Sequence, residues 1–347
     1  WLPPLATRSM AAEAVSAARL GDKASPGFGA FVRVALDGRV TLISPKIEMG
    51  QGVQTGIAMM VAEELEVPLS QVTIEESPPN AALYTDNILQ FQATGGSSST
   101  RYAWEPLRKA GATARVLLTQ AAAIRWNVAP SLCHAENGKV IGPNGQSLAY
   151  GELVEAASQL PEPKDVPLKA IADFKLLGTS AQRLDTPHKV NGSAVFTIDV
   201  KIPDMLIASS LTCPVHGGKL RSVKDDAARK IHGVRDVIRL ENAVAVTATN
   251  FWSCQQALKA LEIEWDFGPH ASIDSAQLDK ALLDASSKDG VFAKQTGDIG
   301  AALKNASSKF EAVYQQPFLS HSPLEPMTCV AHVRPDMCEL WVGCQAP

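Results

Sequence analysis

Apolar and polar positions alternate with two different periods in the first part of the chain, which predicts a mixture of strands and helices. Residues 31–44 (FVRVALDGRVTLIS) hold two runs of period two on either side of an Asp-Gly turn, a pattern typical of a β-hairpin. Apolar residues recur at helical spacing over residues 53–65, and residues 72–75 return to a strand pattern. Further helices are predicted over residues 101–126 and 150–159. These elements predict an α+β domain.

Short strands and helices alternate again in a second unit farther along the chain. Helices are predicted there at residues 225–230 and 250–260. The predicted strands are residues 194–200, 206–212, 234–240, 243–247 and 261–265.

The patterning and the proline-rich stretches divide the chain into six segments. They are an extended lead-in at 1–28, a first α+β segment at 29–160, a linker at 161–182, an α/β unit at 183–268, a helical connection at 269–309 and a strand-rich segment at 310–347. The last segment carries two strand patterns, residues 328–333 and 339–343. The chain begins at Trp1 without a methionine, which suggests a processed chain whose export signal has been removed.

Two glycine-rich loops, each leading into a predicted helix, hold the candidate chemistry. We call residues 48–56 (EMGQGVQTG) the first corner and residues 94–100 (TGGSSST) the second corner. Glycine lets a ligand approach the backbone closely, and a helix N-terminus presents unpaired N–H groups and a positive dipole end. Both corners therefore favour an anionic, phosphate-bearing ligand. The candidate binding residues are Gly50, Gln51, Gly52 and Thr55 at the first corner and Thr94, Gly95, Gly96, Ser97, Ser98 and Ser99 at the second.

Simpler interpretations of both corners stay open. The glycines of the first corner would then only shape a turn, and the serines of the second would only cap a helix. Neither corner has the spacing of a P-loop or of a dinucleotide-binding fingerprint, so a nucleotide-dependent oxidoreductase is disfavoured.

Charge and cysteine spacing exclude some partners and metal sites. The net charge is −4 and no block of lysine or arginine occurs, so we expect no nucleic-acid partner. The six cysteines form no CxxC pair, which argues against a zinc knuckle or an iron–sulfur cluster in this chain. Cys329, Cys338 and Cys344 lie close together near the end, but we interpret them as buried strand residues rather than metal ligands.

The order of these motifs resembles one enzyme family. The two corners resemble the cofactor-binding large subunit of the xanthine oxidase superfamily, and more narrowly the isoquinoline 1-oxidoreductase β-subunit and bacterial aldehyde dehydrogenase type. Residues 183–199 resemble the start of that family's α/β hammerhead domain. Residues 317–345, which end in the motif WVGCQ, are similar to its next cofactor-binding segment. The resemblance thus implies molybdopterin-binding segments that flank a small hammerhead domain.

The resemblance also implies a cofactor and roles for particular residues. The cofactor would be molybdopterin cytosine dinucleotide, whose dithiolene holds the molybdenum, so the protein would supply no metal ligand. Gln51 and the Gly95–Ser99 loop would contact the pterin and its phosphates. Gln345 matches the catalytic-site glutamine that hydrogen-bonds an oxygen ligand on the metal, and it would tune that ligand.

The implied reaction inserts water-derived oxygen at a C–H bond of an N-heterocycle or an aldehyde. Electrons would pass to two 2Fe–2S clusters on a small partner subunit and from there to an acceptor such as a cytochrome c. The enzyme would lie in the periplasm or on the periplasmic face of the inner membrane. The family's glutamate base and a further glycine-rich loop follow the Gln345 position, so we expect them from the remaining C-terminal half, in the same or a second chain. A cofactor-binding or assembly module without turnover is the alternative.

Four residues of this chain are weak substitutes for groups of that C-terminal half. Glu48, Glu311 and Glu325 are candidates for the base, and His321 for the substrate channel. Their sequence context marks none of them as catalytic.

Overall fold

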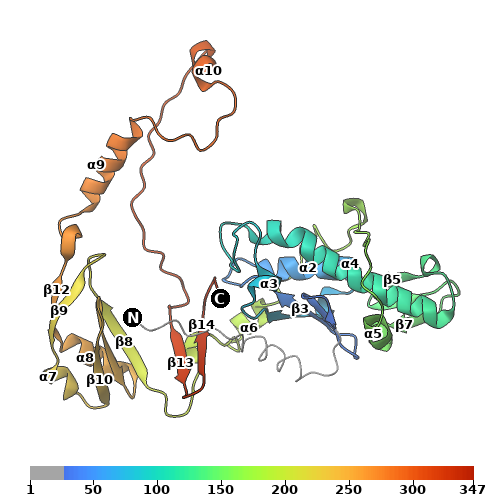
Figure 1. Ribbon diagram of the computed structural model, residues 1–347, viewed down its shortest axis with the longest axis horizontal. Helices are drawn as coiled ribbons and strands as arrows, with labels where there is room; N and C mark the ends of the chain where they lie inside the picture. The colour runs from blue at the N-terminus through green and yellow to red at the C-terminus, as the bar shows by residue number, and fades with distance from the viewer. Residues whose placement is uncertain (1–26) are drawn as a thin grey trace. The chain divides into compact units, whose positions relative to one another are not determined.

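The computed structural model describes residues 27–347 and divides into two compact units (Figure 1). The first unit takes in the chain up to Phe196 together with Val342–Pro347, and the second comprises Thr197–Trp341. Nearly all of the predicted lead-in, residues 1–28, lies outside the described residues. Helices and strands mix in both units, in agreement with the predicted α+β class.

A four-stranded sheet lies at the centre of the first unit. Its strands are β1 (Gly27–Phe28), β2 (Val32–Val34), β3 (Val40–Ser44) and β4 (Val72–Glu76), hydrogen-bonded in that order. β2 and β3 form the predicted antiparallel hairpin, whereas β3 and β4 run parallel. Helix α2 (Val53–Leu65) makes the crossover between the parallel pair, and its bounds are those predicted from the apolar spacing.

Two helices cover this sheet and bury most of its apolar surface. Helix α4 (Ser99–Trp126) lies alongside α2 (Figure 1), and a Cβ at Gly111 would come within 2.8 Å of the Val61 carbonyl oxygen. Glycine at this position therefore lets the two helices approach closely. The predicted helix over residues 150–159 is α5 (Tyr150–Ser158), which packs on α4. The buried Tyr150 hydroxyl donates to the Leu65 carbonyl at the end of α2 at 2.6 Å.

Some short elements of the first unit were not predicted. They include a three-stranded sheet of β5 (His134–Glu136), β6 (Lys139–Ile141) and β7 (Ser147–Ala149) and the helices α3 (Ala81–Tyr84) and α6 (Thr186–Val190). Runs of three to five residues are too short to show a hydrophobic period, which explains why the pattern missed them.

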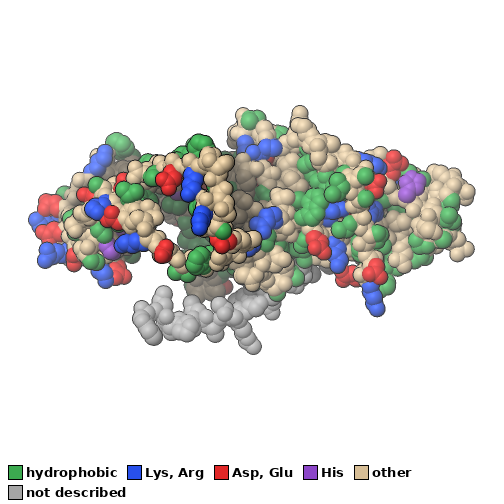
Figure 2. Space-filling model, turned by 90° about the horizontal axis from the view of Figure 1, so that it is seen from above, with side chains coloured by type: hydrophobic (Ala, Val, Ile, Leu, Met, Phe, Trp, Pro, Cys, Tyr) green, Lys and Arg blue, Asp and Glu red, His purple; other side chains and the backbone are tan. Residues whose placement is uncertain are grey.

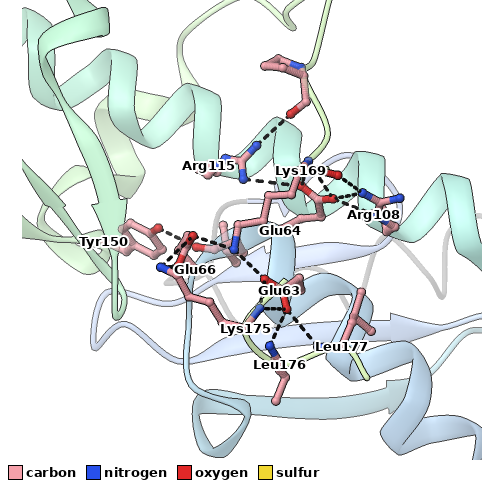
Figure 3. Close-up of polar contacts among 12 residues, drawn as sticks. Glu63, Glu64, Glu66, Arg108, Arg115, Tyr150, Lys169, Lys175, Leu176 and Leu177 are labelled. Carbon is pink, nitrogen blue, oxygen red and sulfur yellow. Dashed lines mark hydrogen bonds and ion pairs between the residues drawn. The ribbon is translucent and has the colours of Figure 1, made fainter. Parts of the chain in front are cut away.

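A cluster of carboxylates at the C-terminal end of α2 holds the segment that follows α5. Glu63 accepts hydrogen bonds from the backbone N–H groups of residues 175–177 (Figure 3). It also forms an ion pair with Lys169 at 2.6 Å. Buried Glu64 pairs with Arg108 at 2.7 Å, and Glu66 also pairs with Lys169. Burial raises the pKa of Glu63, but these hydrogen bonds together lower it to about 2. The carboxylate cluster (Glu63, Glu64 and Glu66) thus holds the segment from Lys169 to Leu177 along α2.

The second unit contains two small antiparallel sheets with two helices. One sheet has the order β10 (Val234–Arg239), β11 (Ala243–Ala248) and β8 (Ile207–Thr212), and the other pairs β12 (Glu262–Asp266) with β9 (Lys219–Lys224). Helices α7 (Asp226–Arg229) and α8 (Phe251–Lys259) contact the first sheet. Their buried apolar residues form a core of their own, centred on Val244, Val246 and Ala257.

One predicted strand of this region is wrong, and one strand was not predicted. Residues 194–200 form no strand, because the chain there makes a 3-10 turn at Thr197–Asp199. Strand β9 was missed because its sequence, KLRSVK, is mostly charged or polar and its apolar residues stand at a spacing of three.

The remaining elements follow the two sheets of the second unit in the sequence. They are the helices α9 (Ser275–Ser286) and α10 (Ile299–Asn305) and the antiparallel strands β13 (Cys329–Val333) and β14 (Cys338–Val342). Cys329 and Cys338 begin these strands but are exposed, which corrects the expectation that they are buried. All six cysteines of the chain are free thiols.

Candidate functional site

The structure brings Gln345 to the second corner. The Thr94 backbone N–H donates to the Gln345 carbonyl oxygen at 2.8 Å, and the Gln345 side-chain Nε2 donates to the Thr94 carbonyl oxygen at 2.7 Å. Thr94 is buried, whereas Gln345 is exposed. Two site residues that lie 251 positions apart in the sequence are therefore held together by two hydrogen bonds.

The second corner keeps several hydrogen-bond donors free. Gly96 and Ser97 adopt left-handed backbone angles, with φ of 57° and 52°. Within the described residues, the backbone N–H groups of Gly95, Gly96 and Ser97 have no acceptor. Ser98 occupies the N-cap of α4 but makes no capping bond, because its buried hydroxyl donates to Asp86 at 2.8 Å. Helix capping by Ser98 thus does not explain the serine row, and Ser99 is simply the first residue of α4.

The first corner differs because a carboxylate of the chain occupies its donors. Glu48 accepts the backbone N–H groups of Gly50 at 2.8 Å, Gly52 at 2.9 Å and Gln54 at 3.2 Å. Gly50 and Gly52 have φ of 103° and 84°, which turns these N–H groups inward. A phosphate at this corner would therefore have to displace the Glu48 side chain.

Other groups also close the first corner. Arg183 Nη1 donates to the Gly50 carbonyl oxygen at 2.9 Å, and Nη2 pairs with Glu48 at 3.3 Å. The buried Thr55 hydroxyl accepts the Leu184 N–H at 3.0 Å and so supports the chain rather than a ligand. Gln51 is exposed, and its Nε2 donates to the Ile47 carbonyl at 3.1 Å. Gln51 is the predicted residue of this corner whose side chain is best placed to meet a ligand.

The two corners are connected to each other directly. The Ile47 backbone N–H, next to Glu48, donates to the Thr94 hydroxyl at 2.8 Å. Beneath them lies a buried ion pair of Lys46 and Asp86, which was not singled out in the sequence. The sequence feature that could have indicated this pair is a lysine just after an apolar strand. Arg183 could have been noticed only through its family-like motif.

The other candidate groups are open to solvent. Glu311, Glu325 and His321 are all exposed, so their surroundings do not mark them as catalytic. Within residues 27–347, no group of three or more His, Cys, Asp or Glu side chains is arranged to hold a metal ion. On the face seen in Figure 2, acidic and basic side chains are interspersed. No described helix has both the length and the apolar character of a membrane span.

Comparison with known proteins places the chain in a family. A family model described as a molybdopterin cofactor-binding domain matches residues 8–205. A nicotinate dehydrogenase subunit from Pseudomonas putida is 30% identical over 331 residues, covering 91% of this chain and 27% of the relative. The isoquinoline 1-oxidoreductase β-subunit of Brevundimonas diminuta is 32% identical, covering 91% and 46%. A membrane-bound aldehyde dehydrogenase (pyrroloquinoline-quinone) of Gluconacetobacter polyoxogenes is 28% identical, covering 93% and 44%.

These relatives are longer than the chain, which spans less than half the length of each of the three. The matched region nevertheless includes both corners, and the family model by itself covers more than half of the chain. The chain belongs to the molybdopterin cofactor-binding subunits of the xanthine oxidase family.

Proposed function

We propose that this chain forms the cofactor-binding part of a molybdenum hydroxylase that acts on an N-heterocycle or an aldehyde. Three of the family-like motifs bear on this proposal: the two corners and the WVGCQ motif. The observation that carries it is the pair of hydrogen bonds between Thr94 and Gln345, which joins the second corner to the WVGCQ motif. The bond from Ile47 to Thr94 adds the first corner to the same place. One ligand could therefore contact all three.

The residues of the second corner fit an anionic group of such a cofactor. Three successive N–H groups, those of residues 95–97, are free to donate within the described structure. A Cβ at Gly95 would meet nothing within 4 Å, and one at Gly96 would meet only the Leu89 side chain at 3.6 Å. The space beside this backbone is open, and the start of the 28-residue helix α4 adds a positive dipole end. The second corner can therefore hold a phosphate without rearrangement.

Gln345 is suited to the role that the resemblance implies for it. Its Nε2 has two N–H groups, and one of them binds the Thr94 carbonyl. The second N–H remains available to donate to an oxygen atom near the second corner. Because the amide is fixed through the corner that would bind the phosphate, cofactor binding and amide position are coupled. When bound, the molybdopterin cofactor would supply the two-electron oxidation and the oxygen transfer.

Finer features of the proposal follow from the resemblance and the relatives. The cofactor would be the cytosine dinucleotide form, and electrons would leave through 2Fe–2S clusters on a small partner subunit to an acceptor such as a cytochrome c. The remaining C-terminal half would complete the site and supply the glutamate base, with the enzyme located in the periplasm. We place the hammerhead domain at residues 183–268, where the structure has two small sheets with helices.

Analysis of the metal and the nucleotide in the purified complete protein tests this proposal. We expect about one molybdenum per chain, together with a pterin and a cytidine nucleotide released on denaturation. One relative is named as a pyrroloquinoline-quinone enzyme, so the quinone is measured in the same extract. Quinone without molybdenum would overturn the proposal. Molybdenum without turnover of any aldehyde or N-heterocycle would favour the assembly module instead.

A further inference from the structure

A buried ion pair lies directly beneath the second corner. The ammonium group of Lys46 pairs with the Asp86 carboxylate, and their side chains are 1% and 0% exposed. Lys46 follows strand β3 and leads into the first corner, whereas Asp86 lies in the loop before the second corner. The pair thus joins the two chain segments from which the corners emerge.

The hydrogen bonds of this pair reach the second corner on two sides. Lys46 Nζ also donates to the Ala93 carbonyl oxygen at 2.6 Å, one residue before Thr94. Asp86 accepts a hydrogen bond from the buried Ser98 hydroxyl at 2.8 Å, at the N-cap of α4. The loop that carries the free N–H groups is therefore fixed at both ends by one ion pair.

Further contacts hold the pair itself in place. The Lys46 ammonium lies 4.7 Å from the centre of the Tyr102 ring in the first turns of α4. Burial raises the pKa of Asp86, but hydrogen bonds from Lys46, from two backbone N–H groups and from Ser98 lower it overall. Asp86 therefore stays charged, and the ammonium keeps a fixed partner.

Stability alone is a poor reason for such a pair. Desolvating two charges is expensive, and apolar residues of similar volume often replace a buried ion pair without loss of stability. What apolar residues cannot replace is the directed bonding to Ala93 and Ser98, which sets the backbone path of residues 94–98. The arrangement favours a role in positioning.

We propose that Lys46 and Asp86 are positioning residues that hold the second corner in the shape that binds the cofactor's phosphate. They touch no reacting atom and act through Ala93, Thr94 and Ser98. The proposal deepens the proposed function and rests on it for the identity of the ligand. The positioning of the loop can be measured without any ligand.

The test compares this pair with a second buried pair of the first unit. Arg108 and Glu64 lie 2.7 Å apart with side chains 7% and 0% exposed, in the carboxylate cluster at the opposite end of α2 (Figure 3). We would make Lys46→Met/Asp86→Leu and Arg108→Met/Glu64→Leu in the complete protein. Each double variant removes both charges of its pair. Arg115, which also pairs with Glu64 at 3.5 Å, is partly exposed and keeps its bond to the Pro167 carbonyl, so neither variant leaves a fully buried ion unpaired. Asp86→Asn, which keeps the shape of the side chain, is the third variant.

Two readouts separate positioning from structure. In cofactor-free protein, amide hydrogen exchange of Thr94 and Ser98, whose N–H groups bind the Gln345 and Gly95 carbonyls, should quicken at least tenfold in the Lys46/Asp86 variant and stay unchanged in the Arg108/Glu64 variant. In loaded protein, molybdenum content should fall at least fivefold in the Lys46/Asp86 variant and in Asp86→Asn, which leaves the buried Lys46 ammonium without its counter-ion, and should stay unchanged in the Arg108/Glu64 variant. Equal exchange rates at Thr94 and Ser98 in both double variants would overturn the positioning role. If the wild type holds no molybdenum, the proposed function fails, while the exchange result still decides the role of the pair.

Discussion

The two glycine-rich corners look alike in sequence but differ in what their backbone donors bind. At the first corner, Glu48 accepts three backbone N–H groups and is itself held by Arg183. At the second corner, the N–H groups of residues 95–97 have no acceptor among the described residues. The nearest carboxylate, Asp86, lies beneath the loop and binds the Ser98 hydroxyl instead. One corner therefore carries its own anion, and the other is ready to accept one.

This difference shows what a glycine-rich loop before a helix does and does not indicate. Glycine permits the turn and the close approach, but the occupant of the N–H groups is decided by side chains from elsewhere. We infer that the second corner binds phosphate, whereas the first contributes contacts through Gln51 and keeps its shape through Glu48.

The largest effect is expected from a side chain placed at the open corner. Gly96→Val puts a branched residue at φ of 57° beside the free donors, so cofactor content should fall at least tenfold. Gly145→Val is the matched control, because Gly145 also has positive φ (76°) and open space around it but lies in the turn between β6 and β7. Molybdenum analysis of both variants checks the expectation. Equal losses would show that backbone strain, and not the corner, is responsible.

The next effect concerns the glutamine that the second corner holds. Gln345→Ala removes the side-chain amide but keeps the backbone bond from Thr94, so the cofactor should be retained. Turnover by the complete enzyme should fall roughly 10- to 100-fold, the range typical of outer-shell hydrogen bonds at metal sites. Cys344→Ala, one residue earlier, should leave both quantities unchanged. Steady-state rates normalised to molybdenum measure the effect, and an unchanged rate would remove Gln345 from the site.

Lowering the pH should destabilise the protein through the C-terminal end of α2, where carboxylates also accept hydrogen bonds from backbone N–H groups. The pKa of Glu63 is lowered from 4.5 to about 2, so its contribution to stability is present above pH 4.5 and lost as the pH falls toward 2. The loss should be of the order of 3 kcal/mol for this group. Denaturant unfolding between pH 6 and pH 2.5 measures it, and Glu63→Gln should flatten the dependence. An equally steep dependence in that variant would contradict the assignment.

The smallest effect is expected when the first corner loses its own anion. Glu48→Gln weakens the bonds to Gly50, Gly52 and Gln54, which should lower the unfolding free energy by about 1 kcal/mol. Cofactor content should change less than twofold, because this corner does not bind the phosphate. Glu155→Gln on the exposed face of α5 is the control for loss of one carboxylate. A loss of molybdenum as large as that of Gly96→Val would show that both corners bind the phosphate.

Local features could be predicted from the sequence, and long-range ones could not. The 31–44 hairpin and the bounds of α2 followed from short apolar periods, and the two corners from glycine before a helix. The contacts that distinguish the corners join residues far apart: Lys46 and Asp86 by 40 positions, Glu48 and Arg183 by 135, and Thr94 and Gln345 by 251. A single sequence contains no periodic signal for such pairs. The motifs could suggest Thr94 and Gln345 as site residues, but not that the two are hydrogen-bonded to each other.

Amide hydrogen exchange of the complete protein, with and without its molybdenum cofactor, tests the difference between the corners most directly. Cofactor-free protein can be made in a host unable to synthesise molybdopterin. We predict that cofactor slows exchange at residues 95–97 at least tenfold, because their free N–H groups gain an acceptor. Exchange at Gly50, Gly52 and Gln54 should stay nearly unchanged, because Glu48 already binds their N–H groups. Protection confined to residues 50–54, or none at residues 95–97, would contradict the account.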